Sequence, residues 1–416
     1  MTGNNNSKTG VWLIGALGDV ATTLIVGSLA IGRKLTAPTG MVSCLAPMNQ
    51  LNLTSVDKLI FGGQDIRSIT ATEAAKEISQ RSRTFTSELL DQIQPELSKI
   101  DGNIVNSSHL NWSSNATEQQ KDLTEIVRAQ RLLLSTFIEQ NKLDHLVVIN
   151  LASAEPTATE ACEFESLKNF EQLISNNRKD LVLPSMLHAY AAFQQGCSYI
   201  NFTPNSGASI PALQELAKQN NLPHYGNDGK TGETLVKTAL APMFLKRNLH
   251  IMSWEGINML GNNDGKNLNK PDRCEGKLKN KADVLQNILS YPLHNDVNIN
   301  YVPSLGDWKT AWDMIHFKGF LDVPMTMQFT WQGCDSILAA PLILDMIRFS
   351  EFAVRHNESG PMHHLSSFFK NPIEVDEMAF FPQFEMLLNY TYKHLSLQQT
   401  SAPDSNRTEP KNIAGG

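Results

Sequence analysis

The residues best placed to do chemistry lie between Asn258 and Lys281, in the segment NMLGNNDGKNLNKPDRCEGKLKNK. The segment concentrates cationic side chains in a chain whose formal net charge is -7. They follow a polar turn at 261–265 that can present backbone N–H groups to an anion. This combination favours a phosphorylated ligand. The cationic residues are Lys266, Lys270, Arg273, Lys277, Lys279 and Lys281.

Within this segment, Lys277 and Lys281 are the lysines best suited to proton transfer. If the chain is helical after Pro271, they lie four residues apart on one helix face, whereas Lys279 points away. Neighbouring ammonium groups lower each other's pKa when they are partly desolvated, which suits acid–base catalysis near neutral pH. The alternative is a solvated basic helix face, and the rest of the chain must decide between the two.

Length and composition limit the classes of protein to consider. A chain of 416 residues with 41% hydrophobic content favours two domains, or one domain with a large insertion. Its longest apolar runs, near 21–31 and 337–347, are too short to span a membrane, and the polar start resembles no signal peptide. Five scattered cysteines without a C-x-x-C pair favour reduced thiols. We therefore expect a cytoplasmic protein that binds neither membrane nor nucleic acid.

The first element expected to position this chemistry is a dinucleotide-binding turn. An apolar run at 11–14 ends at Gly15, and a helical pattern opens within the next residues, Ala-Leu-Gly-Asp-Val-Ala. A strand, a glycine turn and a helix N-terminus together form a cradle for a diphosphate. Leu17 and Val20 stand where the G-x-G-x-x-G pattern has glycine, and Asp19 would repel a diphosphate unless it points away. From these residues alone, an ordinary strand-to-helix turn stays open.

Similar strand, polar turn and helix units recur along the chain. Asp65 follows an early strand, where it can accept hydrogen bonds from ribose hydroxyls. Buried strands at 145–151 and 198–202 also end in small polar turns, the first containing Ala152. The repetition predicts an α/β fold with a Rossmann-like doubly wound parallel sheet.

The pattern changes after residue 250. Strands at 252–254, 298–302 and 324–331, with few helices between them, predict an inserted and more antiparallel α+β unit. A long apolar helix is expected from Asp335 to about Arg355, followed by a short helical segment that holds Lys370. The polar end of the chain is expected to be disordered.

Taken together, these motifs resemble the myo-inositol-1-phosphate synthase family from about residue 10 to residue 384. The family's L-G-N-N-D-G hallmark is intact at 260–265, and its K-x-x-x-K pair matches Lys277 and Lys281. The sequence departs from the family pattern at Leu17, Val20, Ala21, Gln64 and Met259. Further matching segments are GGQDI at 62–66, GNDGKTG at 226–232, GDWKTA at 306–311, GCDSILAAPL at 333–342 and FFKNP around Lys370.

The resemblance implies a domain organisation and an assembly. Residues 9–233 would form the first part of an NAD-binding Rossmann-like domain, and 339–397 would return to it. Residues 234–338 would form an inserted catalytic and tetramerisation domain, and 398–416 a disordered tail. The family's oligomer would make the protein a homotetramer.

The resemblance also implies a reaction, the conversion of D-glucose 6-phosphate to 1D-myo-inositol 3-phosphate without net oxidation. Bound NAD would take a hydride from C5, an enolate at C6 would attack the C1 aldehyde, and the same cofactor would reduce the cyclic ketone. Lys277 would transfer the proton at the C5 oxygen. Lys281 and Lys309 would hold the phosphate or the C1 oxygen, and Lys370 would close the site.

The remaining roles follow from the same resemblance. Asp228 and Asp335 would tune the lysines or orient the nicotinamide and the sugar hydroxyls, and Asn258 would contact the ligand. The residues expected to bind NAD are Gly15, Gly18, Asp19, Val20, Ala21, Asp65, Ile66, Ala152, Asp228, Thr231 and Asp335. The residues expected to bind substrate are Asn262, Asn263, Asp264, Lys277, Lys281, Lys309 and Lys370.

Three other functions stay open at this stage. The protein could be a related NAD-dependent cyclase for another sugar phosphate, an NAD-dependent sugar-phosphate dehydrogenase, or a ligand-binding paralogue without turnover. The metal requirement is unknown. The adjacent pair His363 and His364 has poor geometry for one metal ion, and a divalent cation or an ammonium ion beside the cofactor or the phosphate stays open.

Overall fold

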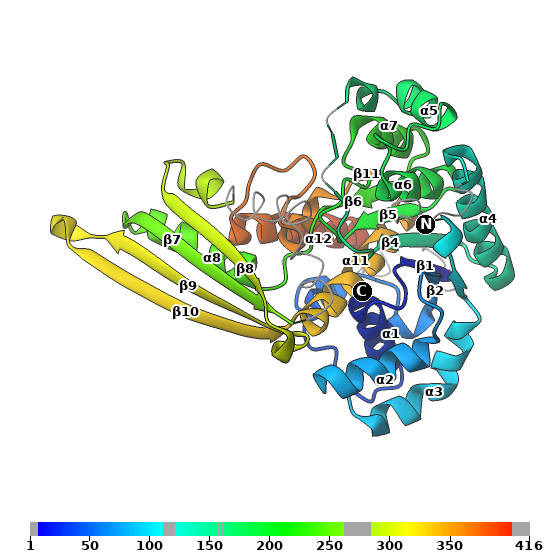
Figure 1. Ribbon diagram of the computed structural model, residues 1–416, viewed down its shortest axis with the longest axis horizontal. Helices are drawn as coiled ribbons and strands as arrows, with labels where there is room; N and C mark the ends of the chain where they lie inside the picture. The colour runs from blue at the N-terminus through cyan, green and yellow to red at the C-terminus, as the bar shows by residue number, and fades with distance from the viewer. Residues whose placement is uncertain (1–6, 111–120, 157, 160, 262–283, 402–416) are drawn as a thin grey trace, which may run out of the picture.

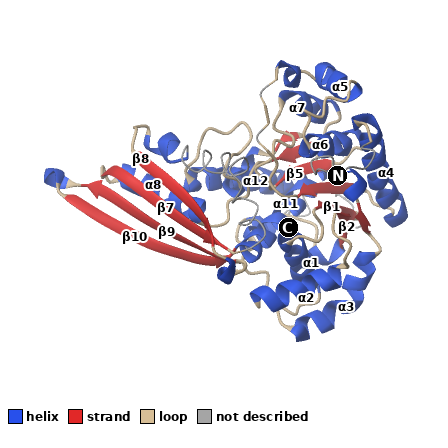
Figure 2. Cartoon of the chain, in the orientation of Figure 1, coloured by secondary structure: helices blue, strands red, loops and turns tan. Residues whose placement is uncertain are grey.

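The computed structural model describes residues 7–110, 121–156, 158–159, 161–261 and 284–401. Two sheets dominate the described part of the chain (Figure 1). One lies inside a helix-covered body that contains most of the first 230 residues, and the other extends from that body as a long, narrow ribbon of strands (Figure 2). Both termini of the described chain belong to the helix-covered body.

The helix-covered body is built on a seven-stranded sheet in the order β11-β6-β5-β4-β1-β2-β3, with every neighbouring pair parallel. Strands β2 and β3 lie on one side of β1, and β4, β5 and β6 lie on the other. The strand order therefore reverses between β1 and β4, which confirms the doubly wound fold expected from the sequence. The strands are β1 Thr9–Ile14, β2 Leu59–Asp65, β3 Ile104–Asn106, β4 His145–Asn150, β5 Ser198–Asn201, β6 Pro223–Tyr225 and β11 Gly360–Pro361.

Alternation along β1 divides the apolar core between the two faces of this sheet. Val11 and Leu13 belong to a cluster with α1, α2, α3 and α11, whereas Trp12 and Ile14 belong to a cluster with α4, α5, α6 and α7. A continuous apolar strand is therefore buried on both sides, as the sequence predicted. The helices are α1 Asp19–Gly32, α2 Ala71–Ser82, α3 Ser87–Asp101, α4 Leu123–Asn141, α5 Leu167–Ser175, α6 Pro184–Gln194 and α7 Pro211–Gln219.

The region 71–101 folds into two separate helices, α2 and α3. Thr70 and Glu73 form a capping box that starts α2, and Arg83 ends it in a left-handed conformation with φ 53°. The hydroxyl of Thr86 then accepts a hydrogen bond from the N–H of Leu89 and starts α3. Local capping residues therefore override a continuous helical period.

The second sheet has four strands in the order β10-β9-β7-β8. Strand β9 is antiparallel to both β7 and β10, whereas β8 is parallel to β7. The expected strands near 252, 298 and 324 are present, and β9 was not anticipated. The helix α8, Glu233–Lys246, packs Ala241 and Phe244 against one face of this sheet. The strands are β7 His250–Leu260, β8 His294–Tyr301, β9 Trp308–Lys318 and β10 Pro324–Cys334.

The chain then returns to the first sheet through α11, Asp335–Arg355, as the sequence predicted. Lys370 lies two residues beyond the short 3-10 helix His363–Phe368 rather than inside a helical segment. The chain continues into α12, Phe380–Ser401, which the sequence analysis did not anticipate.

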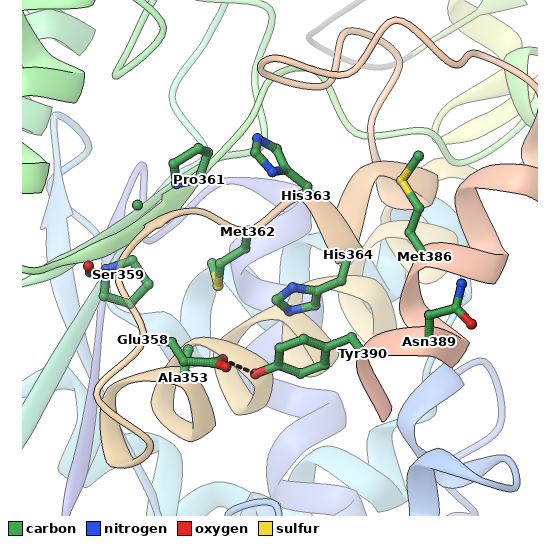
Figure 3. Close-up of a pocket in the computed structure, with 12 residues that line it drawn as sticks. Ala353, Glu358, Ser359, Pro361, Met362, His363, His364, Met386, Asn389 and Tyr390 are labelled. Atoms are coloured by element: carbon green, nitrogen blue, oxygen red, sulfur yellow. Dashed lines mark hydrogen bonds between the residues drawn. The ribbon is translucent and has the colours of Figure 1, made fainter. Parts of the chain in front are cut away.

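Helix α12 helps to line a pocket of about 600 Å³ at the edge strand β11 (Figure 3). Three of the side chains that line this pocket, those of Glu358, His364 and Tyr390, interact with one another. Tyr390 donates a hydrogen bond to the Glu358 carboxylate at 2.6 Å, and the ring of His364 stacks on Tyr390 with centroids 3.7 Å apart. Apart from the adjacent His363 and His364, no residue singled out from the sequence lines this pocket.

Across the described ranges, none of the helices is both long enough and apolar enough to cross a membrane.

Gly63 in β2 provides a test of how tightly β1 and β2 are packed. A Cβ at this position would lie 2.3 Å from the carbonyl oxygen of Leu13, whereas a Cβ on Gly27 in α1 meets nothing within 4 Å. We expect Gly63→Ala to lower the free energy of unfolding by about 1–3 kcal/mol through overpacking. The matched Gly27→Ala should raise it by about 0.5–1 kcal/mol. Urea unfolding of both variants measures the difference, and equal effects would contradict the packing described here.

Candidate active site

The first part of the candidate site is the turn between β1 and α1, at the carboxyl end of the parallel sheet. Gly15 has φ +83°, and a Cβ there would lie 3.0 Å from the carbonyl oxygen of Leu151, so glycine alone fits without strain. Gly18 is the N-cap residue of α1, and no side chain caps this helix. The first N–H groups of α1, on Asp19, Val20 and Ala21, therefore face outward with the positive end of the helix dipole. These groups fit a diphosphate.

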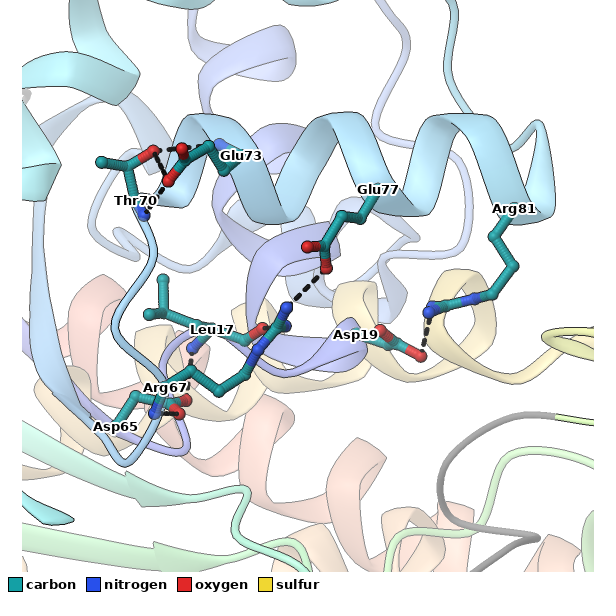
Figure 4. Close-up of polar contacts among 8 residues, drawn as sticks. All are labelled: Leu17, Asp19, Asp65, Arg67, Thr70, Glu73, Glu77 and Arg81. Carbon is teal, nitrogen blue, oxygen red and sulfur yellow. Dashed lines mark hydrogen bonds and ion pairs between the residues drawn. The ribbon is translucent and has the colours of Figure 1, made fainter.

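Two of the departures from the glycine pattern, Leu17 and Ala21, do not obstruct this turn. Leu17 is 1% exposed and Ala21 is fully buried, and both side chains belong to the apolar cluster behind the turn. The backbone, rather than these side chains, faces the expected diphosphate. Asp19 points to α2, where its carboxylate lies 2.6 Å from the guanidinium of Arg81 (Figure 4).

The second part of the site is the end of β2, where the adenosine ribose is expected. The Asp65 carboxylate accepts hydrogen bonds from the N–H groups of Leu17 and Arg67, at 2.8 and 2.9 Å. The guanidinium of Arg67 donates to the carbonyl oxygen of Leu17 at 2.9 Å, so both backbone groups of Leu17 are held. Each carboxylate oxygen has a second lone pair, which leaves Asp65 able to accept from ribose hydroxyls. The side chain of Ile66 is 59% exposed at this edge.

The third part is the turn 226–232, between β6 and α8. Asp228 has φ +61°, a strained conformation that persists only where the surroundings hold it. Its N–H donates to the carbonyl oxygen of Thr203 at 2.8 Å, and its own carbonyl oxygen accepts from the N–H of Lys370 at 2.7 Å. The side chains also meet, because the Lys370 ammonium donates to the Asp228 carboxylate at 2.8 Å. Two residues that the sequence placed in the site are thus in direct contact.

Lys230, in the same turn, is a residue that the sequence analysis missed. It is 2% exposed, and its ammonium nitrogen donates to the side-chain oxygen of Gln383 in α12 at 2.6 Å. Burial, together with the nearby charge of Lys370, lowers the pKa of Lys230 to about 7. The only sequence signal was its place inside the G-N-D-G-K-T-G motif.

Thr231, Asp335 and Ala152 lie at neighbouring element ends. The hydroxyl of Thr231 donates to the carboxylate of Asp335 at 2.8 Å, which connects the turn 226–232 to the first residue of α11. Ala152 follows β4, and its N–H donates to the side-chain oxygen of Asn150 at 3.2 Å. Ala152 and the Gly15 turn therefore flank the reversal of strand order, where open α/β sheets bind their ligands.

The inner face of the mixed sheet supplies the fourth part. Asn258 in β7 pairs with Ala311 in β9, and Lys309 lies on the same face of β9 as Ala311 because side chains alternate. Asn258 is fully buried, and neither of its side-chain polar atoms has a hydrogen-bond partner among the described residues. Buried amides normally have partners, so this one is available to a ligand or to residues outside the described ranges.

A buried ionic cluster lies on the same inner face, one register step from Asn258, and was not foreseen either. The Lys237 ammonium lies 2.8 Å from the Glu233 carboxylate and 3.5 Å from the Asp313 carboxylate. Trp254 donates to Asp313 at 2.8 Å. Burial and the neighbouring Glu233 raise the pKa of Asp313 to about 6, although Lys237 opposes this. Two carboxylates around one ammonium leave the cluster with an excess of negative charge when all three are ionised.

Comparison with known proteins agrees with this geometry. A family model described as myo-inositol-1-phosphate synthase, an NAD-binding family, matches residues 9–391. The chain belongs to this family. Inositol-3-phosphate synthase 1 of Bacteroides thetaiotaomicron is 34% identical over 88% of this chain and 90% of its own length. The family match confirms the resemblance that the motifs indicated.

Solved structures agree on the fold. The crystal structure of inositol-3-phosphate synthase from Caenorhabditis elegans aligns with a TM-score of 0.81 at 25% identity, over 92% of this chain and 85% of that one. A myo-inositol-1-phosphate synthase-related protein from Thermotoga maritima aligns with a TM-score of 0.74 at 21% identity, over 92% and 98%. Both support the combination of a doubly wound sheet with a second, mixed sheet.

Some of the expected site residues lie outside the described ranges. The polar turn and the lysine pair fall within residues 262–283, outside the described residues. Their roles stay predictions. Within the described ranges, no cluster of His, Cys, Asp or Glu side chains has the arrangement needed to hold a metal ion. The unplaced site residues are Asn262, Asn263, Asp264, Lys277 and Lys281.

The buried amine of Lys230 gives a pH-dependent prediction. Its pKa is about 7 in the folded protein against 10.5 for an unperturbed lysine, so between these values the unfolded chain binds a proton that the folded chain does not. Stability should therefore rise with pH in this window. Relative to Lys230→Met, the free energy of unfolding of the unmodified protein should increase by up to about 1.4 kcal/mol per pH unit. Urea unfolding from pH 7 to 9 measures it. The exposed-site variant Lys218→Met is the control, and parallel curves for all three proteins would contradict a desolvated Lys230.

Proposed function

We propose that the protein is an NAD-dependent inositol-3-phosphate synthase that converts D-glucose 6-phosphate to 1D-myo-inositol 3-phosphate. The observation that carries the proposal is the contact of Asp228 with Lys370 beside Lys230, at the same carboxyl-end edge of the parallel sheet as a turn built for a dinucleotide. The relatives named inositol-3-phosphate synthase confirm the expected enzyme class, an isomerase. An ordinary sugar-phosphate dehydrogenase would need fewer amines around the sugar.

The residues present fit NAD. The uncapped N–H groups of α1 would hold the diphosphate, Asp65 the adenosine ribose, and Thr231 with Asp335 the nicotinamide end. When bound, NAD supplies a reversible hydride acceptor, which allows oxidation and reduction within one turnover. The chain's own residues must then transfer the protons and stabilise the negative charge on the sugar oxygens.

Lysine side chains can stabilise negative charge on the sugar oxygens. Oxidation at C5, enolisation at C6 and ring closure at C1 each place negative charge on an oxygen, and fixed ammonium groups stabilise such charge most strongly where water is excluded. Lys370 is 12% exposed and anchored by Asp228, so it would approach the sugar in a fixed orientation. Lys309 would hold the phosphate or the C1 oxygen from the inner face of β9. Lys277 would transfer the proton at the C5 oxygen, and Lys281 would assist Lys309.

The proposed assembly is a homotetramer formed through the inserted domain, residues 234–338. Its support is the outer face of the mixed sheet, opposite α8. Ile257 and Met259 of β7 lie beside Trp312 and Met314 of β9 on this face, and all four side chains are only partly buried. A contiguous, partly exposed apolar stripe on a sheet is typical of a protein interface.

The activity test uses purified protein, glucose 6-phosphate and a catalytic amount of NAD. We expect an inositol monophosphate to accumulate with no lasting change in absorbance at the nicotinamide band, because the hydride returns to the product. Lys277→Ala and Lys370→Gln, which keeps a hydrogen-bond donor for Asp228, should each slow turnover by about 10²–10⁴-fold while the fold is kept. The exposed-site variant Lys218→Ala is the control.

Each rival function predicts a different outcome in this assay. Steady accumulation of NADH would identify a dehydrogenase. Inertness toward glucose 6-phosphate together with turnover of another hexose phosphate would identify a different cyclase. A near-normal rate for Lys277→Ala would remove that lysine from the catalytic set, and repeating the assay with a chelator or with ammonium would show whether either ion is required.

The assembly has its own test. Trp312→Glu places a charge in the apolar stripe, so we expect the tetramer to separate into smaller species in size-exclusion chromatography with light scattering. Lys218→Glu, on the exposed face of α7, should leave the mass unchanged. A tetramer that persists with Trp312→Glu would exclude this face as the interface.

A further inference from the structure

The turn that should receive the diphosphate carries a carboxylate of its own. Asp19 is the first residue of α1 and follows the N-cap Gly18 directly. An acidic side chain at this position is favourable to the helix, because it interacts with the positive end of the dipole. The same interaction makes it a competitor for any anionic ligand, since a carboxylate and a diphosphate at one helix N-terminus repel each other. An unpaired Asp19 would therefore oppose dinucleotide binding.

Arg81 removes this conflict. It lies in the last turn of α2, and its guanidinium is 2.6 Å from the Asp19 carboxylate (Figure 4). The two side chains are 33% and 19% exposed, so the pair is partly withdrawn from solvent. Water and salt screen such a pair less than a fully exposed one. The charge of Asp19 is thus directed away from the first N–H groups of α1 and neutralised.

The neighbouring arginine does not share this task. Arg67 forms an ion pair with Glu77 at 2.5 Å and donates to the carbonyl oxygen of Leu17. Figure 4 shows Arg67 in the loop before α2 and Arg81 in the last turn of α2, each with its own acidic partner. Arg67 holds the shape of the turn, whereas Arg81 balances its charge.

The end of α2 is itself held by a hydrogen bond from strand β9 of the mixed sheet. The indole N–H of Trp308, the first residue of β9, donates to the carbonyl oxygen of Ser82 at 3.1 Å. Lys309 follows Trp308 directly in β9. Arg81 therefore stands between the dinucleotide turn and the strand that carries a proposed catalytic lysine, and its position is constrained from both sides.

We propose that Arg81 is a positioning residue for the dinucleotide: it holds Asp19 away from the N-terminus of α1 and so allows the altered turn of this chain to bind the diphosphate of NAD. This inference rests on the proposed use of NAD. Arg81 acts through Asp19 and need not touch the cofactor. The pairing with Arg81 explains how a carboxylate at the first position of α1 is compatible with dinucleotide binding.

The test measures NAD binding directly, by titration calorimetry, on the full chain. Arg81→Gln should weaken NAD binding by about tenfold or more, because Asp19 is left charged beside the diphosphate. Asp19→Asn keeps the backbone N–H and removes the carboxylate, so it should bind NAD more tightly than the unmodified protein does, because Arg81 is then an uncompensated cation near the diphosphate. The decisive variant is Arg81→Gln combined with Asp19→Asn, which should return the dissociation constant to within about threefold of the original value. The deficit of Arg81→Gln should also shrink at high salt, which screens the uncompensated charge.

Controls separate this role from a purely structural one. Arg81→Lys keeps the charge and should retain most of the affinity, and Arg178→Gln breaks the exposed pair with Asp180 and should change nothing. A double variant as weak as Arg81→Gln alone, or an Arg81→Gln protein that binds NAD normally, would overturn the inference and leave the proposed function intact. Failure of the unmodified protein to bind NAD would refute the proposed function and this inference with it.

Discussion

The ion pair between Asp228 and Lys370 is the interaction on which the rest of the site depends. Both side chains are largely withdrawn from water, where an unpaired charge would cost several kcal/mol. The backbone supports the pair, because the N–H of Lys370 donates to the carbonyl oxygen of Asp228 and the N–H of Lys230 donates to that of Phe368. This short ladder joins the end of β6 to the segment before α12. The strained backbone of Asp228 is tolerated because its N–H, its carbonyl oxygen and its side chain are all hydrogen-bonded.

Charge balance then explains why so many acidic groups surround a site for an anionic sugar. Amines gathered in a site of low polarity repel one another and lose protons, as the depressed pKa of Lys230 shows. Asp228 offsets Lys370 directly, and the cluster of Glu233, Lys237 and Asp313 contributes net negative charge on the inner face of the mixed sheet. An arriving phosphate adds negative charge in front of the amines. The buried carboxylates therefore balance the charge of the amines before a ligand arrives.

The sequence predicted the parts of this architecture that local patterns encode. The apolar runs of β1 and β4, the small polar turns that follow them and the span of α11 were all recognisable from composition and period. Family motifs brought Asp228 and Lys370 together across 142 residues, which no local pattern can do. Strand β9 was missed because Asp313 interrupts its apolar face, and that carboxylate is compatible with burial only through Trp254 and Lys237. The contacts of Lys230 with Gln383 and of Asp19 with Arg81 were missed for a related reason: each joins side chains from separate elements.

The proposed reaction places a further demand on the fold, because the cofactor that accepts the hydride must return it to the same sugar. The dinucleotide turn belongs to the first sheet and Lys309 to the second, so relative movement of the sheets would separate cofactor from substrate. The chain prevents this at the joint. Strand β10 ends at Cys334, α11 begins at the next residue, and Ser336 and Cys334 both donate to the Asp307 carboxylate, at 2.6 and 3.0 Å. With Trp308 also bonded to the end of α2, the base of the mixed sheet is attached to the dinucleotide domain on two sides. A joint of this kind favours one fixed geometry for both hydride steps over a hinge that opens between them.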